Sequence, residues 1–232
     1  MGRTGEDGGA DVDGGGQMST VLDAQGVRQW ISLAAELVTA HERELTELDA
    51  AIGDADHGAN MRRGFQAAAQ AVQDPALATP GAVLKKVAMT LISTIGGASG
   101  PLYGTFFLRM AGECGDSPEI DLPVLLRAME AGVAGVQARG RSQAGEKTML
   151  DAWLPALEAM RGQSDLAAGT AAAARAAQEG RGATAAMRAT KGRASYLGQR
   201  SVGHIDPGAA STALVLQALA QAETATSQEE QA

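Results

Sequence analysis

The residues with the clearest chemical meaning are three aspartates in one short segment, Asp49, Asp54 and Asp56. Carboxylates this close repel one another, so a packed fold keeps them together only beside a compensating positive charge. Mg²⁺ is the natural candidate, because it takes oxygen ligands and shares them with substrate phosphates. Gly53 lets the backbone bend so that the carboxylates can converge. The segment therefore predicts a site for one or two Mg²⁺ ions; the alternative is a solvated acidic loop whose aspartates cap helices.

Two further polar residues stand at the start of the next predicted helix. His57 and Asn60 are three residues apart, so their side chains can point the same way. Because the N-terminus of a helix favours anions, both could contact phosphate oxygens beside the metal. Capping of the helix is an equally good interpretation of this pair.

Glycine-rich turns occur at three other places, residues 96–101, 145–148 and 206–209. Bare backbone N–H groups in such turns can hold a phosphate, although glycines serve tight interhelical turns equally well. Carboxylates for a metal, together with glycine turns for phosphate, are typical of phosphoryl transfer. That reaction class is the first functional prediction.

Two segments are similar to known motifs, the nucleophile elbow and the P-loop, but match neither. Ser99 lies in Gly-Ala-Ser-Gly-Pro, where a proline replaces the last glycine of a nucleophile elbow and no strand precedes the turn. Residues 140–148 imitate a P-loop, but Glu146 is inserted before Lys147, and again no strand leads into the loop. A serine hydrolase and a Walker A site are therefore not predicted. The second segment could still contact a nucleotide, with Met149 either against the base or in the core.

A small group of basic residues, Lys191, Arg193 and Arg200, lies close to His204 and Asp206 along the chain. Guanidinium groups suit bidentate phosphate binding. Ordinary surface charge is the alternative for each of the three.

The overall composition narrows the class of protein. The chain has 232 residues, a net charge of −8 and one cysteine, so a nucleic-acid partner and an internal disulfide are not expected. No apolar run approaches the length of a membrane span, and the acidic, glycine-rich N-terminus is unlike a signal peptide. A cytoplasmic location follows as the expectation. Aromatic residues make up only 3%, which favours closely packed helices over a β-sandwich.

Apolar residues recur at helical spacing along the chain, beginning with Val27, Trp30, Ile31 and Ala34. No alternating, β-branched run indicates a strand. Helices are predicted over 24–48, 58–72, 83–92, 101–110, 122–138, 148–160, 165–179 and 207–221. These elements predict an all-α fold, an antiparallel eight-helix barrel or bundle. Residues 1–18 contain little that could be buried and are predicted to be a disordered leader.

Taken together, these segments resemble the L subunits of dihydroxyacetone kinase, the nucleotide-binding half of that enzyme. The matching motifs span 48–65, 96–105, 145–149 and 191–208; they occur in family order within residues 26–220. Four ordered motifs are more specific than any one of them. The resemblance implies that residues 19–232 form one nucleotide-binding kinase domain, an eight-helix antiparallel barrel with the nucleotide at one end.

The resemblance also implies roles for individual residues. Asp49, Asp54 and Asp56 would hold two Mg²⁺ ions that bridge to the phosphates of ADP or ATP. The residues expected around the phosphates are His57, Asn60, Ala98, Ser99 and Thr105, and those around the rest of the nucleotide are Gly140, Met149, Arg193, Asp206, Pro207 and Gly208. No residue of this chain is expected to act as a catalytic acid or base.

Partners follow from what the resemblance leaves out. The family's sugar-binding half has no room here, so a separate K subunit would hold dihydroxyacetone, and an M subunit of the phosphotransferase system would rephosphorylate a retained ADP. The alternatives are ATP as a consumed substrate, or a kinase of another short ketose or of a protein-held fatty acyl group. A nucleotide-sensing regulator of transcription and a plain helical scaffold are the rivals from other classes. A homodimer is left open.

Overall fold

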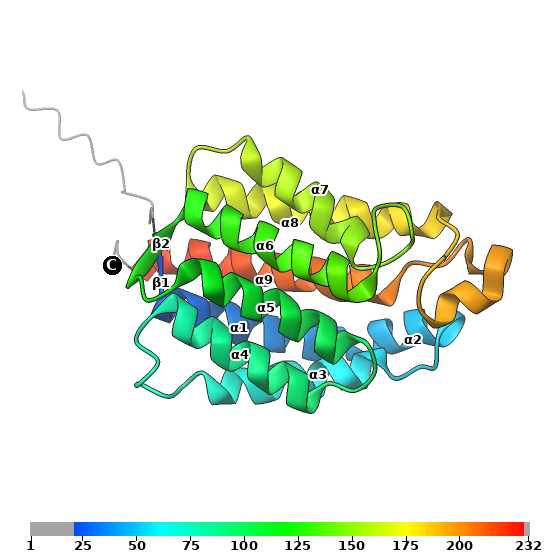
Figure 1. The fold of residues 1–232 in the computed structure, drawn as a ribbon, viewed down its shortest axis with the longest axis horizontal. Helices are drawn as coiled ribbons and strands as arrows, with labels where there is room; N and C mark the ends of the chain where they lie inside the picture. Colours follow the sequence, from blue (N-terminus) through cyan, green and yellow to red (C-terminus); the bar gives the residue numbers. More distant parts are fainter. Residues whose placement is uncertain (1–20, 230–232) are drawn as a thin grey trace, which may run out of the picture.

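The computed structural model describes residues 21–229, with side chains up to Thr224, and this part of the chain is almost entirely helical (Figure 1). The predicted leader, residues 1–18, lies outside the described residues. The α-helices are α1 Ala24–Ala40, α2 Glu42–Ile52, α3 His57–Ala71, α4 Pro80–Thr94, α5 Ser99–Cys114, α6 Leu122–Gly140, α7 Leu150–Arg161, α8 Leu166–Ala183 and α9 Pro207–Glu229. Two 3₁₀ segments, η1 Thr184–Ala186 and η2 Arg193–Ser201, lie between α8 and α9. The all-α prediction is confirmed.

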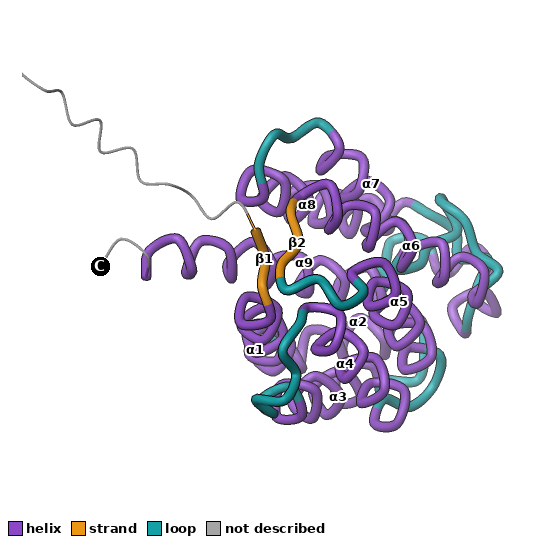
Figure 2. The backbone as a smooth tube through the Cα atoms, turned by 60° about the vertical axis from the view of Figure 1, so that its left-hand side comes forward, coloured by secondary structure: helices purple, strands orange, loops and turns teal. Residues whose placement is uncertain are grey.

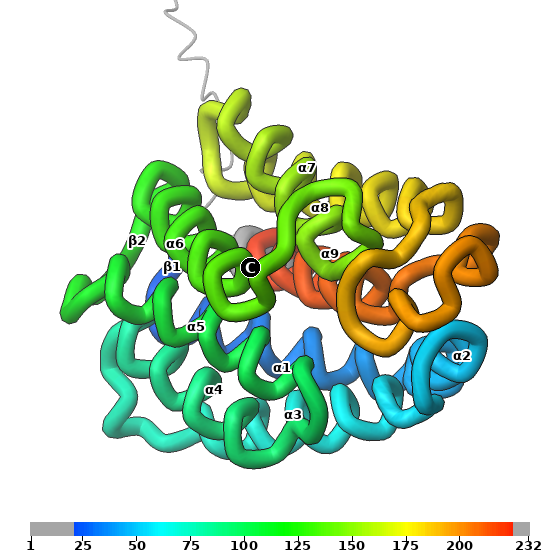
Figure 3. The backbone as a smooth tube through the Cα atoms, turned by 45° about the vertical axis from the view of Figure 1, so that its right-hand side comes forward, coloured from blue at the N-terminus to red at the C-terminus, as the bar shows by residue number. Residues whose placement is uncertain are grey.

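Eight of the helices close into a barrel. Around the ring, α1 contacts α3, each helix from α3 to α8 contacts the next, and α9 packs back onto α1. Neighbours in this ring are antiparallel, as the two oblique views show (Figures 2 and 3). The remaining α-helix of the described residues, α2, lies at one end of the barrel, where it contacts α3, α9 and η2.

Two details differ from the sequence-based expectation. The predicted helix 24–48 is broken at His41, where a polar run replaces the apolar stripe of α1, and the chain restarts as α2. Asp49 consequently lies inside a helix rather than in the turn. Two strands of three residues each, β1 Val21–Asp23 and β2 Glu119–Asp121, pair antiparallel although no strand was predicted. They are too short for an alternating pattern to show in the sequence.

Six of the seven aromatic residues, all but Tyr196, are buried in the barrel. Phe106 stacks on Trp153 at 4.1 Å between ring centroids and meets Phe107 edge-on at 5.2 Å. Trp30 packs on Phe107 and donates its indole N–H to the carbonyl of Val215 at 2.8 Å. Burial of such large side chains is the main favourable term in folding. The indole N–H of Trp153, unlike that of Trp30, is buried without a hydrogen-bond partner among the described residues. The low aromatic content is therefore concentrated where it stabilises the barrel.

None of the helices within residues 21–229 is both long and apolar enough to cross a lipid bilayer.

The crossing of α2 and α3 depends on Gly58. An added Cβ there would collide with the Glu42 carbonyl oxygen and the Thr46 hydroxyl. We expect Gly58→Ala to push α2 away from α3 and to destabilise the protein by about 1–3 kcal/mol, the usual cost of overpacking. Urea unfolding measures this. Gly112→Ala is the matched control, because nothing lies within 4 Å of a Cβ at this helical position. It should stabilise α5 by up to about 1 kcal/mol. Equal effects at both glycines would contradict the close approach.

The buried Glu223 predicts a pH dependence of stability. Its side chain is 3% exposed, and burial, assisted by Asp23, raises its pKa from 4.5 to about 7. Because the folded-state pKa is raised, the contribution to stability is greatest below pH 4.5 and is lost as the pH rises to about 7. Glu223→Gln should therefore leave the melting temperature nearly unchanged near pH ~5 and raise it near pH ~8, by up to about 3 kcal/mol in stability.

Thermal unfolding of wild type and variant across this pH range tests the expectation. Glu36→Gln, at an exposed glutamate on α1, is the control and should show no pH-dependent difference from wild type. A Glu223→Gln difference that stays constant from acid to alkaline pH would refute the assignment.

Candidate metal and phosphate site

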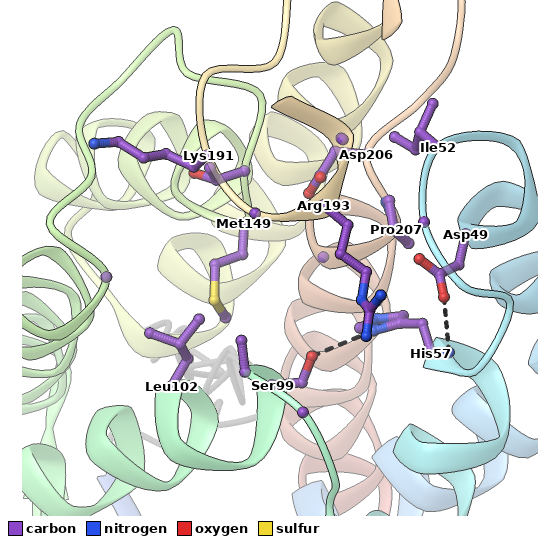
Figure 4. Close-up of a pocket in the computed structure, with 18 of the residues that line it drawn as sticks. Asp49, Ile52, His57, Ser99, Leu102, Met149, Lys191, Arg193, Asp206 and Pro207 are labelled. Atoms are coloured by element: carbon purple, nitrogen blue, oxygen red, sulfur yellow. Dashed lines mark hydrogen bonds between the residues drawn. The ribbon is translucent and has the colours of Figure 1, made fainter. Parts of the chain in front are cut away.

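One cavity of about 470 Å³ opens at the end of the barrel that carries α2 and η2. Most of the predicted site residues line it: Asp49, Asp54, Asp56, His57, Ala98, Ser99, Gly140, Met149, Arg193, Asp206, Pro207 and Gly208. They come from segments far apart in the sequence. Met149 and Leu102 lie on the side of the cavity away from Asp49 (Figure 4). The volume is in the usual range for a pocket that holds a small molecule.

Two predicted residues are not part of this lining. Asn60 is buried on α3, where its Oδ1 accepts a hydrogen bond from Arg63 Nη2 at 2.5 Å. A Cβ at Gly96 would lie 3.4 Å from the same oxygen, so Asn60 supports the glycine turn from behind. Thr105 lies on α5 and donates its hydroxyl to the carbonyl of Pro101 at 2.7 Å.

The antiparallel barrel brings several helix N-termini to the cavity. The first residues of α3, α5 and α9, which are His57, Ser99 and Pro207, line it, as does Met149 just before α7. Helix N-termini carry partial positive charge and unsatisfied N–H groups. Helix starts at the opposite end of the barrel are closed instead by side-chain caps; the capping residues are Asp23 on α1, Thr79 on α4, Asp121 on α6 and Asp165 on α8.

By contrast, α3, α5 and α7 begin without a side-chain cap from their N-cap residues, Asp56, Ala98 and Met149. The start of α5 is the most open of the three. Within residues 21–229, the backbone N–H groups of Gly97, Ala98, Ser99 and Gly100 have no hydrogen-bond acceptor. Unpaired N–H groups that line a cavity are a binding site for an oxyanion such as phosphate.

The three aspartates meet as the sequence predicts. One carboxylate oxygen from each of Asp49, Asp54 and Asp56 lies within 4.8 Å of the others. Asp49 is buried and fixed, because its Oδ2 accepts hydrogen bonds from the backbone N–H groups of Asp56 at 2.9 Å and His57 at 3.2 Å. Asp54 and Asp56 are exposed to the cavity. Three hard oxygen donors of this kind suit Mg²⁺, and the unpaired N–H groups of the α5 turn suit its phosphate co-ligands.

A cation already faces this acidic cluster. Arg193 Nη2 lies 2.9 Å from Asp54 Oδ2, with 68% of the arginine side chain exposed. An exposed pair of this kind contributes little to stability. The arginine side chain can therefore leave Asp54 at a small cost in stability.

His57 connects the acidic segment to the rest of the site. Its Nδ1 lies 3.3 Å from Ser99 Oγ, and its Nε2 lies 2.9 Å from Ser211 Oγ. Burial lowers the pKa of His57, although the neighbouring carboxylates of Asp49 and Asp56 oppose that shift. Ser211 and its partner Tyr103 were not singled out by sequence reasoning, because a serine and a tyrosine inside helices carry no local signal.

Lys147 is the other residue whose place only the structure shows. It has φ 61° and is 1% exposed, and its ammonium donates to the carbonyl oxygens of Thr184 at 2.5 Å and of His204. Burial lowers the pKa of Lys147 and raises that of the neighbouring Asp206 to about 7. The lysine therefore braces both ends of the segment that carries η2, and does not reach toward a phosphate as a P-loop lysine would.

These groups divide the cavity into two parts. Carboxylates, N–H groups and Arg193 gather at one side and can hold a divalent cation and phosphates. Leu102 and Met149 lie on the other side and offer apolar surface that can hold a flat ring (Figure 4). This combination of carboxylates, N–H groups and a guanidinium favours transfer of a phosphoryl group between bound molecules.

Comparison with known proteins gives concordant results. The DAK2 domain family model matches residues 51–221. The chain is 46% identical over 195 residues to the "PEP-dependent dihydroxyacetone kinase 1, ADP-binding subunit DhaL" of Listeria innocua, covering 84% of this chain and 94% of the relative. It is 42% identical over 199 residues to the corresponding ADP-binding subunit DhaL of Escherichia coli, covering 83% and 94%.

A solved structure extends the comparison to the fold. The dihydroxyacetone kinase from C. freundii in complex with AMP-PNP and Mg²⁺ superposes with a TM-score of 0.68 at 24% identity. The match covers 95% of this chain and 38% of that longer chain. At this identity the similarity supports the helical barrel and nothing finer.

The aspartate cluster is tested by neutralising its exposed members. Asp54→Asn or Asp56→Asn should weaken binding of ADP with Mg²⁺ at least about tenfold, because each removes a charged ligand worth on the order of 1.4 kcal/mol or more. Isothermal titration calorimetry measures the affinity, and far-UV circular dichroism checks the helical content. Asp116→Asn, an exposed aspartate in the turn after α5, is the control. Wild-type affinity in both cluster variants would rule out the metal site.

Proposed function

The chain belongs to the DAK2 domain family, and on that premise we propose that it is the ADP-binding subunit of a dihydroxyacetone kinase. Its role is to transfer the terminal phosphoryl group of a bound nucleotide to dihydroxyacetone held by a separate K subunit. The relatives are named PEP-dependent and match this chain over 94% of their length. We therefore favour phosphoenolpyruvate as the ultimate donor, through an M subunit of the phosphotransferase system that rephosphorylates the ADP in place.

The observation that carries this proposal is the pairing of two features across one cavity. The aspartate cluster supplies oxygen ligands, and the uncapped start of α5 supplies unpaired N–H groups. A nucleotide diphosphate with Mg²⁺ needs both kinds of group at once. A helical scaffold without a ligand has no reason to leave the start of α5 open at the cavity end when every helix start at the other end has a side-chain cap.

Each part of the proposed complex has residues to hold it. Asp49, Asp54 and Asp56 hold two Mg²⁺ ions, which when bound supply positive charge to the phosphate oxygens. The Ala98 turn and the backbone N–H of Ser99 contact the phosphates beside His57, while Asn60 on α3 and Thr105 on α5 lie outside the cavity lining. The groups proposed for the rest of the nucleotide are Gly140, Met149, Arg193, Asp206, Pro207 and Gly208. No acid–base residue is required of this chain.

The acceptor must reach the cavity from outside. The η2 segment contributes Arg193 and Ala194 to the cavity lining, and Tyr196, two residues after Ala194, is 87% exposed. An exposed tyrosine beside an open site is typical of a protein interface. The K subunit would dock here and present its ketone to the phosphoryl group. We place this phosphoryl relay in the cytoplasm. Transfer between its subunits requires neither a nucleic acid nor a membrane.

Nucleotide content tests the proposal directly. The protein is purified without added nucleotide and denatured, and the supernatant is analysed for ADP and ATP. We expect about one ADP per chain, because a cofactor that is recharged in place must be retained. An empty protein that binds ATP with Mg²⁺ reversibly would indicate ATP as a consumed substrate instead.

Transfer is measured in the same preparation. With phosphoenolpyruvate, the phosphotransferase-system donor proteins and a dihydroxyacetone-binding subunit, dihydroxyacetone phosphate should form. The Asp56→Asn variant serves as the inactive control. Nucleotide binding without transfer to any acceptor would support a regulatory protein instead. If ADP with Mg²⁺ did not raise the melting temperature, the protein would be interpreted as a helical scaffold without a ligand.

A further inference from the structure

A buried chain of hydroxyl groups lies behind His57 and is not explained by phosphate or metal binding. Ser211 and Thr212, both fully buried on α9, meet Tyr103 of α5, which is 1% exposed. The Tyr103 hydroxyl lies 2.8 Å from Ser211 Oγ and 3.0 Å from Thr212 Oγ1. Buried polar groups of this kind are costly unless each finds a partner, so their donor and acceptor roles can be worked out by counting.

The count begins at Ser211, whose hydroxyl has one hydrogen and two lone pairs. Its Oγ lies 3.1 Å from the carbonyl oxygen of Gly208, which can only accept. The single Ser211 hydrogen therefore points to Gly208. The two other neighbours of this oxygen, Tyr103 Oη and His57 Nε2 at 2.9 Å, must both donate to it. No other assignment satisfies all three contacts.

The remaining roles follow in order. Burial raises the pKa of Tyr103, so its phenol keeps the hydrogen that it donates to Ser211, and Thr212 donates to the phenol oxygen in turn. His57 Nε2 carries a hydrogen in this arrangement whether the imidazole is neutral or charged. Nδ1 is thus the ring nitrogen that faces Ser99, at 3.3 Å from its Oγ, and in the neutral ring it accepts the serine hydrogen.

We propose that Ser211 and Tyr103 are positioning residues, which lock a hydrogen onto Nε2 of His57 and keep Nδ1 directed at Ser99 on the cavity wall. The relay ties α9 and α5 to the first residue of α3, so the acidic segment and the open start of α5 keep a fixed separation. Because Nδ1 engages the hydroxyl hydrogen of Ser99, this residue can donate to a phosphate only through its backbone N–H. The ring assignment rests on hydrogen-bond geometry alone; only its effect on ADP binding rests on the proposed function.

Long-range ¹H–¹⁵N NMR of histidine-labelled protein, recorded on the alkaline side of neutrality, tests the assignment without any ligand. We expect the pyridine-type nitrogen of His57 to be Nδ1. His41 is an internal reference of opposite kind, because its Nδ1 lies 2.8 Å from the Leu37 carbonyl and must carry the hydrogen there. His57→Gln identifies the resonance. A wild-type His57 with its hydrogen on Nδ1 would overturn the proposal, whatever the activity of the protein.

The positioning role is tested with Ser211→Ala, which removes the acceptor of the Nε2 hydrogen. The Nε2–H fraction should fall, and the affinity for ADP with Mg²⁺ should weaken about tenfold, as expected for a lost buried hydrogen bond. Ser211→Cys keeps the shape with a weaker acceptor and should give an intermediate result if the alanine variant does not fold. Thr212→Val acts one step further from the ring and should leave the His57 tautomer unchanged. An unchanged tautomer and affinity in the Ser211 variants would refute the role.

A failure of this proposal is distinct from a failure of the proposed function. If wild-type protein contains no ADP and transfers no phosphate, the kinase assignment falls while the NMR result still decides the tautomer. If the tautomer is wrong but ADP is retained, the relay falls and the kinase assignment stands.

Discussion

The alternation of helix direction around a closed barrel is the constraint on which the rest of this structure depends. Because neighbouring helices are antiparallel, α3, α5, α7 and α9 all begin at the same end. Their partial positive charges add at that end. Every helix start at the opposite end has a side-chain cap, whereas at the cavity end Asp206 caps α9 and the start of α5 stays open to a ligand. Anion binding is thus a consequence of topology before any particular side chain is considered.

The aspartate cluster adds the opposite charge to the same place. Three carboxylates beside helix N-termini are individually stabilised, yet together they repel one another. The chain holds Asp49 rigidly through two backbone N–H groups and leaves Asp54 and Asp56 free, with Arg193 as a loose counter-charge. The charges of such a site are unbalanced without ligands, and they become balanced when cations and phosphates bind together. The proposed use of ADP with Mg²⁺ follows from that balance.

Rigid buried polar groups fix the distances that this balance requires. Lys147 braces the two ends of the η2 segment through backbone carbonyls, and the relay from Tyr103 to His57 joins α5 and α9 to the acidic segment. Neither contributes a ligand to the proposed metal. Both groups connect elements that are far apart in the chain. Each therefore holds the elements that line the cavity at fixed positions relative to one another. The exposed groups accordingly supply the ligands of the proposed site, and the buried groups fix their positions.

The sequence by itself determined the fold class, the positions of most helices and the cluster of aspartates. These depend on local spacing, in which apolar periodicity marks a helix and crowded carboxylates mark a cation. It did not reveal the break at His41 or the short β1–β2 pair, because both depend on contacts rather than on local pattern. The tertiary structure alone decided that Lys147 points inward and that Asn60 and Thr105 lie outside the cavity lining. It alone placed Tyr103, Ser211 and His57 in one hydrogen-bonded chain, since those partners are 108 and 154 residues apart and only barrel closure brings them together.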